Sequence, residues 1–424
     1  MDATGTPLLL SRRFAPLFWC QFCAAFNDNF LKSSLVFVIL FKSGGGNGGA
    51  LITLASGILI APYFVLSGLG GQIADRHDKA RVAQRLKLVE IFVAGLSAAG
   101  FLLASLPLMF AALAGFGVLG ALFGPVKYGI LPDHLRRDEL PAGNALVEGA
   151  TFIAILAGTI AGGLAAREHD GTAIFLVLIV GFAVAAWTAA LFIPPTAIGA
   201  PHLRVSANVA ASTLAMLRHL RADARLWWGS MVTSWFWLVG IIVLSLLPPL
   251  IKTLIGGDEA TVTAYLALFT VAVGIGSALA AKLAHGRIVL GITVAGAALI
   301  GVFAVDLGIA TLGLAPAAAL QPPGAAFGSA LGLRAAIDLC GLAIAGGLFV
   351  VPAFAAVQAW SDVAYRARTI AGVNVLNAGF MTAATVVVAL LQKQGVTLAE
   401  LFVGLGVLTL GVALAVWRTK PKTV

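Results

Sequence analysis

Charged residues are scarce in this sequence. Lys, Arg, Asp and Glu together make up 11% of the 424 residues, whereas apolar residues make up 60%. A soluble globular protein carries about 25% charged residues, so this chain has too few of them to cover a surface that faces water. The composition excludes an ordinary soluble enzyme, a secreted disulfide scaffold and a disordered tail. It predicts an integral membrane protein.

Residues that commonly carry covalent chemistry or bind metals are also few. Cys20, Cys23 and Cys340 all lie inside apolar stretches, where a thiol serves as a small packing group rather than as a disulfide partner. The six histidines fall in loops or at the edges of apolar runs, without the spacing of a metal site. No nucleotide-binding loop or hydrolase nucleophile motif is visible. We therefore expect no cofactor, no metal ion and no enzymatic activity.

Long apolar runs fill most of the chain. A helix needs about 20 apolar residues to cross the hydrocarbon of a bilayer. Twelve such runs are present, at 14–41, 48–74, 84–106, 107–131, 142–166, 172–193, 226–254, 261–284, 286–314, 334–358, 368–391 and 396–417. The first run is too long to be the apolar part of a signal peptide. We expect an all-α membrane protein with twelve transmembrane helices.

The 27 basic residues are distributed unevenly around these runs. If residue 1 lies inside, two of them fall within the membrane, five on the outer side and the other 20 in cytoplasmic segments. The outer five are Lys42, Arg167, Lys252, Arg334 and Lys393. An excess of Lys and Arg marks the cytoplasmic side, so both termini are expected in the cytoplasm. The net charge of +9 thus indicates orientation in a membrane rather than a nucleic-acid partner.

Residues 194–225 interrupt the succession of apolar runs. This segment begins with Pro194 and Pro195 and carries four arginines, which predicts a cytoplasmic linker. It separates a six-helix half at 1–193 from a second half at 226–424, which ends in a short basic tail. Part of the linker can form an interfacial helix, although a solvated linker fits the sequence equally well.

The two halves contain a weak repeat. The sequence Asn-Ala-Leu-Val-Glu-Gly at 144–149 corresponds to Asn-Val-Leu-Asn-Ala-Gly at 374–379. Just upstream of each, Leu-Phe followed by a proline occurs at 122–125 and again at 348–352. Repeats of six helices with like orientation are typical of the major facilitator architecture.

A basic loop follows the second apolar run, and it resembles the major facilitator loop motif of a glycine, an aspartate and several basic residues. The matching residues are Gly71, Asp75, Arg76, Lys79 and Arg81. The glycine lets two helices approach closely, and Asp75 can cap or pair with a neighbouring helix when the cytoplasmic side is closed. We therefore interpret these five as gating residues. The sequence departs from the motif at Asp78, where glycine is usual, and a merely solvated basic loop is the alternative.

Ionisable residues inside an apolar run are costly in hydrocarbon and are functional candidates by default. In the first run, Asp28 and Lys32 share one helical face with Gln21 because of their spacing. Asn27 and Asn29 flank Asp28 near the middle of the membrane. A local Asp28–Lys32 pair is the alternative, but it leaves both amides unexplained. We predict Asn27, Asp28, Asn29 and Lys32 as substrate-binding residues.

A second candidate group lies nearer the cytoplasm. Lys127 and Tyr128 stand between Pro125 and Gly129, which disturb the helix, and Glu148 enters the next run at about the same depth. A Lys127–Glu148 salt bridge would only hold two helices together, whereas a role in headgroup binding or gating would make both residues functional. Both interpretations remain open, and we predict Lys127, Tyr128 and Glu148 as substrate-binding residues.

The remaining ionisable residues point less clearly to a function. Arg334 and Asp338 are four residues apart and favour a structural pair. Glu90 and Asp306 have no evident partner. His134 and Asp138 are separated by three residues rather than by the four of a glycerolipid acyltransferase box, so we interpret them as loop residues.

Three motifs give the chain a specific resemblance. They are Phe-Asn-Asp-Asn-Phe-Leu-Lys at 26–32, Phe-Gly-Pro-Val-Lys-Tyr-Gly-Ile-Leu-Pro at 123–132 and Asn-Ala-Leu-Val-Glu-Gly-Ala-Thr-Phe at 144–152. The chain resembles the bacterial lysophospholipid transporters of the major facilitator superfamily. This implies a flippase that moves lysophosphatidylethanolamine-type lipids across the inner membrane to the cytoplasmic leaflet for reacylation. It also implies an acyltransferase and an acyl-carrier-protein synthetase as partners, and we expect no such domain before the end at Val424.

One departure concerns the seventh run, which has no charge between Trp235 and Pro248, so a partner for Asp28 from the second half is not evident. Two other functions remain open. The first is a proton-coupled drug or solute transporter of the same fold, with Asp28 or Glu148 as the proton carrier. The second is a non-transporting membrane scaffold that docks an acyltransferase.

Overall fold

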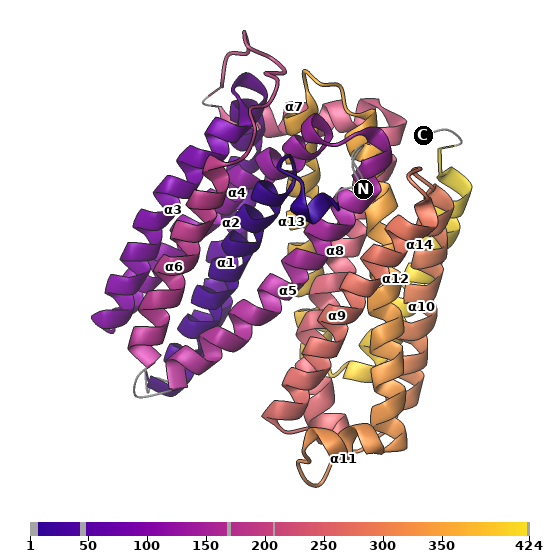
Figure 1. Cartoon of the computed structure of the whole chain (residues 1–424). Helices are drawn as coiled ribbons and strands as arrows, with labels where there is room; N and C mark the ends of the chain where they lie inside the picture. The colour runs from indigo at the N-terminus through magenta and orange to yellow at the C-terminus, as the bar shows by residue number, and fades with distance from the viewer. Residues whose placement is uncertain (1–6, 43–47, 168–170, 207, 422–424) are drawn as a thin grey trace. The chain divides into compact units, whose positions relative to one another are not determined.

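The computed structural model describes residues 7–42, 48–167, 171–206 and 208–421, and within these ranges the chain is built from helices (Figure 1). Its twelve long helices are α1 (Ala15–Lys42), α2 (Gly48–Arg76), α3 (Lys79–Leu102), α4 (Leu106–His134), α5 (Leu140–Arg167), α6 (Gly171–Leu191), α8 (Ala224–Leu250), α9 (Glu259–Ala284), α10 (Leu290–Thr311), α12 (Ala330–Trp360), α13 (Arg366–Lys393) and α14 (Leu398–Thr419). Two shorter helices are α7 (Val209–Ala222) and α11 (Pro323–Gly328). The expected all-α architecture is confirmed.

The helix α3 differs from the other long helices. Among the described residues, eleven helices are long and apolar enough to cross a membrane, and α3 is not one of them because its first half carries many charges. It begins at Lys79 rather than near residue 84, because the Asp78 carboxylate accepts a hydrogen bond from the Ala80 amide and caps the helix. Lys79, which the sequence analysis placed in a basic loop, therefore lies on a helix, and the side chains of Lys79 and Lys87 are both buried.

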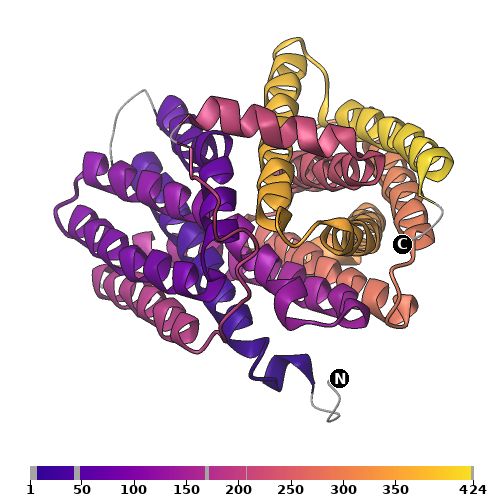
Figure 2. The same ribbon diagram turned by 90° about the horizontal axis from the view of Figure 1, so that it is seen from above.

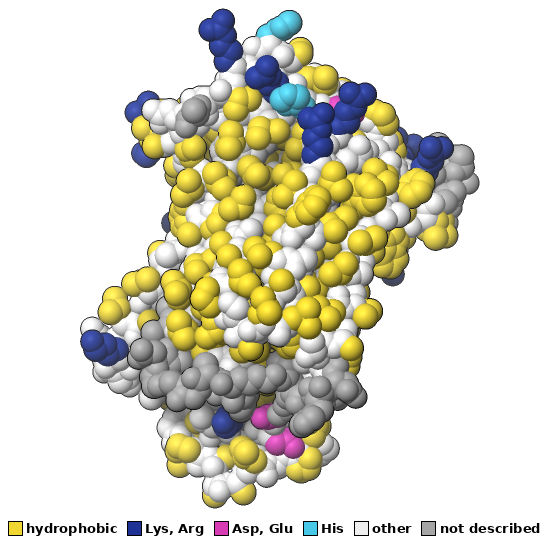
Figure 3. Space-filling view, turned by 90° about the vertical axis from the view of Figure 1, so that its left-hand side faces the viewer, with side chains coloured by type: hydrophobic (Ala, Val, Ile, Leu, Met, Phe, Trp, Pro, Cys, Tyr) yellow, Lys and Arg dark blue, Asp and Glu magenta, His cyan; other side chains and the backbone are white. Residues whose placement is uncertain are grey.

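The surface of the described residues carries large apolar side chains. Phe92, Val177 and Phe192 are each more than 60% exposed, an arrangement that suits contact with lipid better than contact with water. Figure 3 shows apolar side chains over the middle of one face, with Lys and Arg gathered toward one end. The cytoplasmic placement of the termini stays a prediction.

The linker contains the helix α7, which buries Met216 and Leu220. A Cβ atom at Gly68 of α2 would lie 3.1 Å from Met216 Cε, and one at Gly372 of α13 would lie 2.8 Å from Leu220 Cδ1. Figure 2 shows α7 running from α2 toward α13. This part of the linker is therefore a packed helix rather than solvated chain.

The residues cluster into two compact units. Unit 1 consists of Met1–Gly143, Ile153–Ala224 and Gln358–Ala378, and unit 2 of Asn144–Phe152, Arg225–Val357 and Gly379–Val424. The first part of α13 thus groups with unit 1, and a short segment near the start of α5 groups with unit 2. The division of the chain into halves at 193 and 226 stays a prediction.

The core of unit 1 contains a stack of phenylalanines. Phe26 of α1 stacks on Phe182 of α6 with ring centroids 3.9 Å apart, and Phe30 of α1 stacks on Phe175 of α6 at 5.1 Å. Phe101 of α3 also stacks on Phe175, at 4.0 Å. These contacts fix the rotation of α1, so the helical period turns Asp28 away from the aromatic core.

Unit 2 packs its helices closely at small residues. A Cβ atom at Gly276 of α9 would lie 2.1 Å from the Ile344 carbonyl oxygen of α12, so only glycine allows this contact. Small residues at such crossings are typical of helix packing in membranes, where close backbone approach replaces the hydrophobic effect.

Candidate functional site

A network of ion pairs lies in unit 1 where α2 ends and α13 begins. The Asp75 side chain is fully buried and accepts hydrogen bonds from the backbone amides of Ala367 (2.9 Å) and Arg368 (3.2 Å) and from Arg368 Nε (2.8 Å). These amides belong to the first turn of α13, where backbone donors have no partner within the helix. A carboxylate there satisfies the donors and interacts favourably with the helix dipole. Asp75 is therefore the cap of α13.

Gly71 makes this contact possible. A Cβ atom at residue 71 would lie 2.8 Å from Ala371 Cβ and 2.9 Å from the Ala367 carbonyl oxygen. Any side chain would therefore push α2 and α13 apart and draw Asp75 away from the amides that it caps.

Asp133, near the end of α4, joins two cations in the same network. Its Oδ2 accepts a hydrogen bond from Lys79 Nζ at 2.9 Å, and its Oδ1 accepts one from Arg366 Nη1 at 2.7 Å. The side chains of Lys79 and Asp133 are only 1% and 7% exposed. The backbone amide of Lys79 also donates to Thr196 Oγ1 at 2.8 Å, which holds the start of the linker. We call Asp75, Lys79, Asp133, Arg366 and Arg368 the end network.

The structure thus divides the five predicted gating residues. Gly71, Asp75 and Lys79 take part in the contact, whereas Arg76 and Arg81 are exposed on its surface. Arg81 is 76% exposed and lies 3.7 Å from Asp78 Oδ2. Asp133, Arg366 and Arg368 were missed because their partners are distant in sequence. The gating role of these residues stays a prediction.

A second group of charges lies within the helices of unit 1. Lys87 and Glu90 of α3 form an ion pair at 2.5 Å, and each side chain is 2% exposed. Lys87 Nζ also lies 4.0 Å from the centroid of the Phe123 ring of α4, a contact that strengthens when the cation is desolvated. Glu90 therefore has the partner that the sequence analysis did not identify. We call Asp28, Lys87, Glu90 and Lys127 the mid-helix cluster.

Asp28 of α1 is the exceptional member of this cluster. It lies within electrostatic range of Glu90, Lys87 and Lys127, but it forms no hydrogen bond or ion pair with any residue that the structure describes. Lys32 forms no ion pair within the same ranges, so the local Asp28–Lys32 pair is not formed. The face of α1 that carries these two partly exposed residues holds one negative and one positive charge without a direct partner.

The two amides beside Asp28 point elsewhere. Asn27 is fully buried, and its Nδ2 donates to the Ile179 carbonyl oxygen of α6 at 3.0 Å. Asn29 Nδ2 donates to the Ala25 carbonyl oxygen of its own helix at 2.9 Å. Neighbouring residues of a helix point about 100° apart, so Asn27 and Asn29 do not share a face with Asp28. Asn27 thus joins α1 to α6, and the substrate-binding role of Asn27 and Asn29 stays a prediction.

Lys127 and Tyr128 lie in the last third of α4. Lys127 Nζ is 4.5 Å from the centroid of the Tyr128 ring, and the Tyr128 carbonyl oxygen accepts a hydrogen bond from Gln358 Nε2 at 3.2 Å. Glu148 of α5 is 3% exposed and belongs to the segment that groups with unit 2. The Lys127–Glu148 bridge and the substrate role of these residues stay predictions.

In unit 2, Asp306 of α10 has a partner in Arg334 of α12. Arg334 Nη2 donates to Asp306 Oδ1 at 2.6 Å and Arg334 Nε donates to Asp306 Oδ2 at 3.1 Å. Arg334 thus forms a bidentate bridge between two helices and also lies within electrostatic range of Asp338, the partner expected from the sequence. Both side chains of the bridge are almost half exposed, which indicates a surface pair rather than a site.

The charges of unit 1 can bind a charged ligand. Among the described residues, no group of three or more His, Cys, Asp or Glu could hold a metal ion. The mid-helix cluster offers carboxylates and amines on three neighbouring helices, which can meet a ligand that carries both a cation and an anion.

Comparison with protein families identifies the class. The model of the Major Facilitator Superfamily matches residues 17–337. Solved structures of this fold cover nearly the whole chain. The human organic anion transporter MFSD10 (TETRAN) has a TM-score of 0.71 at 15% identity, and the match covers 95% of this chain and 99% of the other. FucP in the outward conformation has a TM-score of 0.69 at 12% identity, with 97% and 99% covered. These likenesses concern the fold alone.

Curated relatives identify a narrower family within this superfamily. The lysophospholipid transporter LplT of Serratia proteamaculans (strain 568) is 32% identical over 286 residues, which are 66% of this chain and 68% of the relative. LplT of Yersinia pestis (strain Pestoides F) is 31% identical over 290 residues, with 66% and 67% covered. The chain belongs to the Major Facilitator Superfamily and, within it, to the family of these bacterial transporters.

Proposed function

We propose that this protein is a lysophospholipid transporter of the bacterial inner membrane, which moves lysophosphatidylethanolamine-type lipids to the cytoplasmic leaflet. The observation that carries the proposal is Asp28, a carboxylate within a membrane helix that has no direct partner among the described residues. An ionised group in such a place is costly unless a ligand or water compensates it. The names of the relatives supply the class of ligand.

The lipid headgroup matches the charges of the mid-helix cluster. Its ammonium would meet Asp28, and its phosphate would meet Lys127 through charge-assisted hydrogen bonds. Lys32 lies one turn further along the face of Asp28 and adds a cation to that face, where it would also meet the phosphate. The single acyl chain would lie along apolar helix faces.

Uptake of lysophosphatidylethanolamine into spheroplasts with and without the protein tests this function directly. We expect uptake to depend on the protein, and lysolipid to raise the melting temperature of the purified chain. Protection by a small solute but not by lysolipid would support a proton-coupled solute transporter instead. Absence of lipid movement in reconstituted vesicles would support a scaffold that docks an acyltransferase.

The headgroup role of Lys127 has its own test. Lys127→Ala should impair uptake more than folding, because the phosphate loses its cation. If Lys127 served only to pair with Glu148, the double variant Lys127→Ala/Glu148→Ala would regain activity, since it leaves no buried orphan charge. Full recovery would remove Lys127 from the binding site.

Two further parts of the proposal concern regulation and partners. The end network, together with Gly71, would hold the cytoplasmic end closed until its ion pairs separate.

An acyltransferase with an acyl-carrier-protein synthetase would consume the delivered lysolipid. Co-purification of such an enzyme with the tagged transporter from its own membranes tests the second point.

A further inference from the structure

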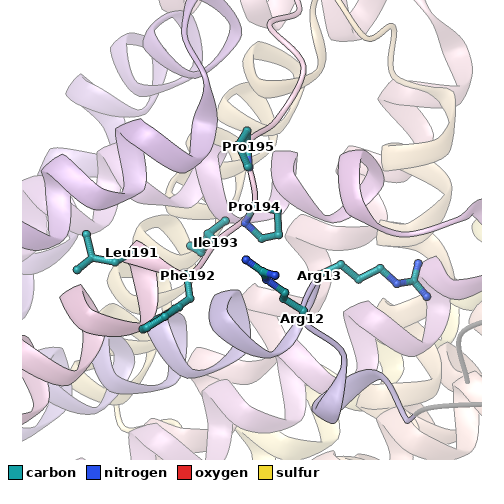
Figure 4. Close-up of a pocket in the computed structure, with 7 residues that line it drawn as sticks. All are labelled: Arg12, Arg13, Leu191, Phe192, Ile193, Pro194 and Pro195. Atoms are coloured by element: carbon teal, nitrogen blue, oxygen red, sulfur yellow. The ribbon is translucent and has the colours of Figure 1, made fainter.

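A cavity outside the transport site lies at the beginning of α1. It has a volume of about 430 Å³, within the range of pockets that hold small ligands. Its lining consists of Arg12, Arg13, Leu191, Phe192, Ile193, Pro194 and Pro195 (Figure 4). It therefore joins the start of the first membrane helix to the end of α6 and the start of the linker, all within unit 1.

The two arginines of this cavity differ in their pairing. Arg13 forms a two-armed ion pair with Glu139, with distances of 2.7 and 2.5 Å, and also donates to the His134 carbonyl oxygen. Arg12 is exposed and forms no ion pair with any acid in the described ranges. In Figure 4 the Arg12 guanidinium points toward Ile193 and Pro194, whereas that of Arg13 points away from them. Arg12 is thus the cation that the cavity presents to a ligand.

The position of Arg12 adds to its uncompensated positive charge. It lies just before α1, and the amino end of a helix carries a partial positive charge that disfavours a cation and favours an anion. Glu139 compensates Arg13 only. An anion in the cavity would compensate Arg12.

The rim of the cavity is apolar and open to its surroundings. Leu191 is 47% exposed and Phe192 63% exposed, and both follow the apolar helix α6. Leu10 and Trp19, near the start of α1, are 75% and 53% exposed. Exposed aromatic and aliphatic side chains beside arginines at a helix end are typical of the membrane interface. A soluble anion would leave this apolar rim in water, whereas a lipid would cover it.

We propose that this cavity binds an anionic diacyl phospholipid, with the phosphodiester on Arg12 and the acyl chains against Leu191 and Phe192. The bound lipid is a resident of the membrane and not the transported substrate, so the site stands independently of the proposed function.

The test measures thermal unfolding of the purified full-length protein in detergent. Phosphatidylglycerol, phosphatidylcholine and inorganic phosphate are titrated separately into the wild type, Arg12→Gln and the control Arg137→Gln. Arg137 is an exposed arginine of the α4–α5 connection and does not line the cavity. We expect phosphatidylglycerol alone to raise the melting temperature of the wild type and the control, with an apparent affinity about tenfold weaker for Arg12→Gln.

Three results would overturn the proposal. Equal responses of Arg12→Gln and Arg137→Gln would remove Arg12 from the site. Equal stabilisation by inorganic phosphate would identify a free-anion site, and equal stabilisation by phosphatidylcholine would show that charge is not recognised. If Arg12→Gln fails to fold, Phe192→Ser replaces it, since it alters only the exposed rim and should also weaken the response to phosphatidylglycerol. An unchanged response of Phe192→Ser would then contradict the lipid assignment.

Discussion

Unit 1 contains two groups of buried charges that are organised differently. In the end network, Asp75 and Asp133 each have cationic partners within 2.9 Å, and Asp75 also caps a helix. In the mid-helix cluster, Lys87 and Glu90 pair with each other, while Asp28 has no direct partner among the described residues. The comparison separates charges that are compensated by the protein from a charge without a direct partner, which the proposed function assigns to the ligand.

The difference has a physical basis. A buried ion pair without one of its partners is strongly destabilising, so a charge that only holds structure is expected to come with its counterion. Asp28 lacks one in a helix whose rotation is fixed by Phe26 and Phe30. Under the proposed function, Asp28 is therefore expected to contribute least to the fold and most to binding.

The largest expected effect comes from Asp28→Asn, which keeps the shape of the side chain but removes its charge. We expect a normally inserted protein with an unchanged melting temperature and a loss of uptake of roughly 100-fold, the value of one charge-assisted hydrogen bond of about 3 kcal/mol. Asp306→Asn removes a carboxylate from a surface pair and is the matched control. Normal uptake by Asp28→Asn, or full rescue by adding Lys32→Ala, would assign Asp28 to the structural charges.

Lys87→Met should destabilise the protein by about 3–5 kcal/mol, because it leaves Glu90 buried without its cation. The double variant Lys87→Met/Glu90→Leu should regain most of this stability, which thermal unfolding in detergent can measure. Uptake by the double variant then distinguishes a structural ion pair from a part of the binding site. Restored uptake would indicate that Lys87 and Glu90 only stabilise the fold. A stable but inactive protein would indicate that they belong to the binding site.

Asp75→Ala should cost about 3 kcal/mol, because Arg368 loses its counterion and the first turn of α13 loses its cap. Asp75→Asn keeps one acceptor for the capped amides and should cost less. Thermal unfolding measures both variants, with Arg368→Gln as the reciprocal change. If Asp75→Ala melted with the wild type, the end network would not hold α2 to α13.

The smallest effect is expected at the exposed arginines of the loop motif. Arg76→Gln and Arg81→Gln should each change stability by less than about 0.5 kcal/mol, because exposed charges are screened by water and salt. A loss of stability comparable to that of Asp75→Ala would show that the network extends to these residues.

The positions of the helices could be predicted well from the sequence. The ion pairs and hydrogen bonds between the helices could not. Apolar runs identify membrane helices because hydrocarbon excludes polar side chains, and the run expected at 261–284 is α9, Glu259–Ala284. The start of α3 was placed too late, because hydropathy alone cannot see that Asp78 caps a charged first turn. The pairing of Lys87 with Glu90 could have been found from their spacing within one helix.

Contacts between residues that are far apart in the sequence could not be predicted from residue spacing. Asp306 and Arg334 are 28 residues apart, and Asp133 and Arg366 are 233 apart. Asn27 illustrates the same limit, since only the packing of α1 on α6 shows that its amide donates to the Ile179 carbonyl oxygen, 152 residues away. The residue types alone indicated where polar contacts form. The rotation of each helix and the helices packed against it determine which residues take part in the same contact.

The cap of α13 has a consequence for the order in which the molecule is made. Asp75 and Ala367 are 292 residues apart, so the carboxylate leaves the ribosome long before the amides that it will accept. During most of synthesis Asp75 must stay hydrated or be shielded by other factors, because Arg368 does not yet exist, and Asp133 has only Lys79 as its cation. Unit 1 therefore cannot complete its folding when its first six helices have been inserted. A nascent chain arrested before α13 would remain an incomplete intermediate, and the last part of translation would close a unit begun at the first helix.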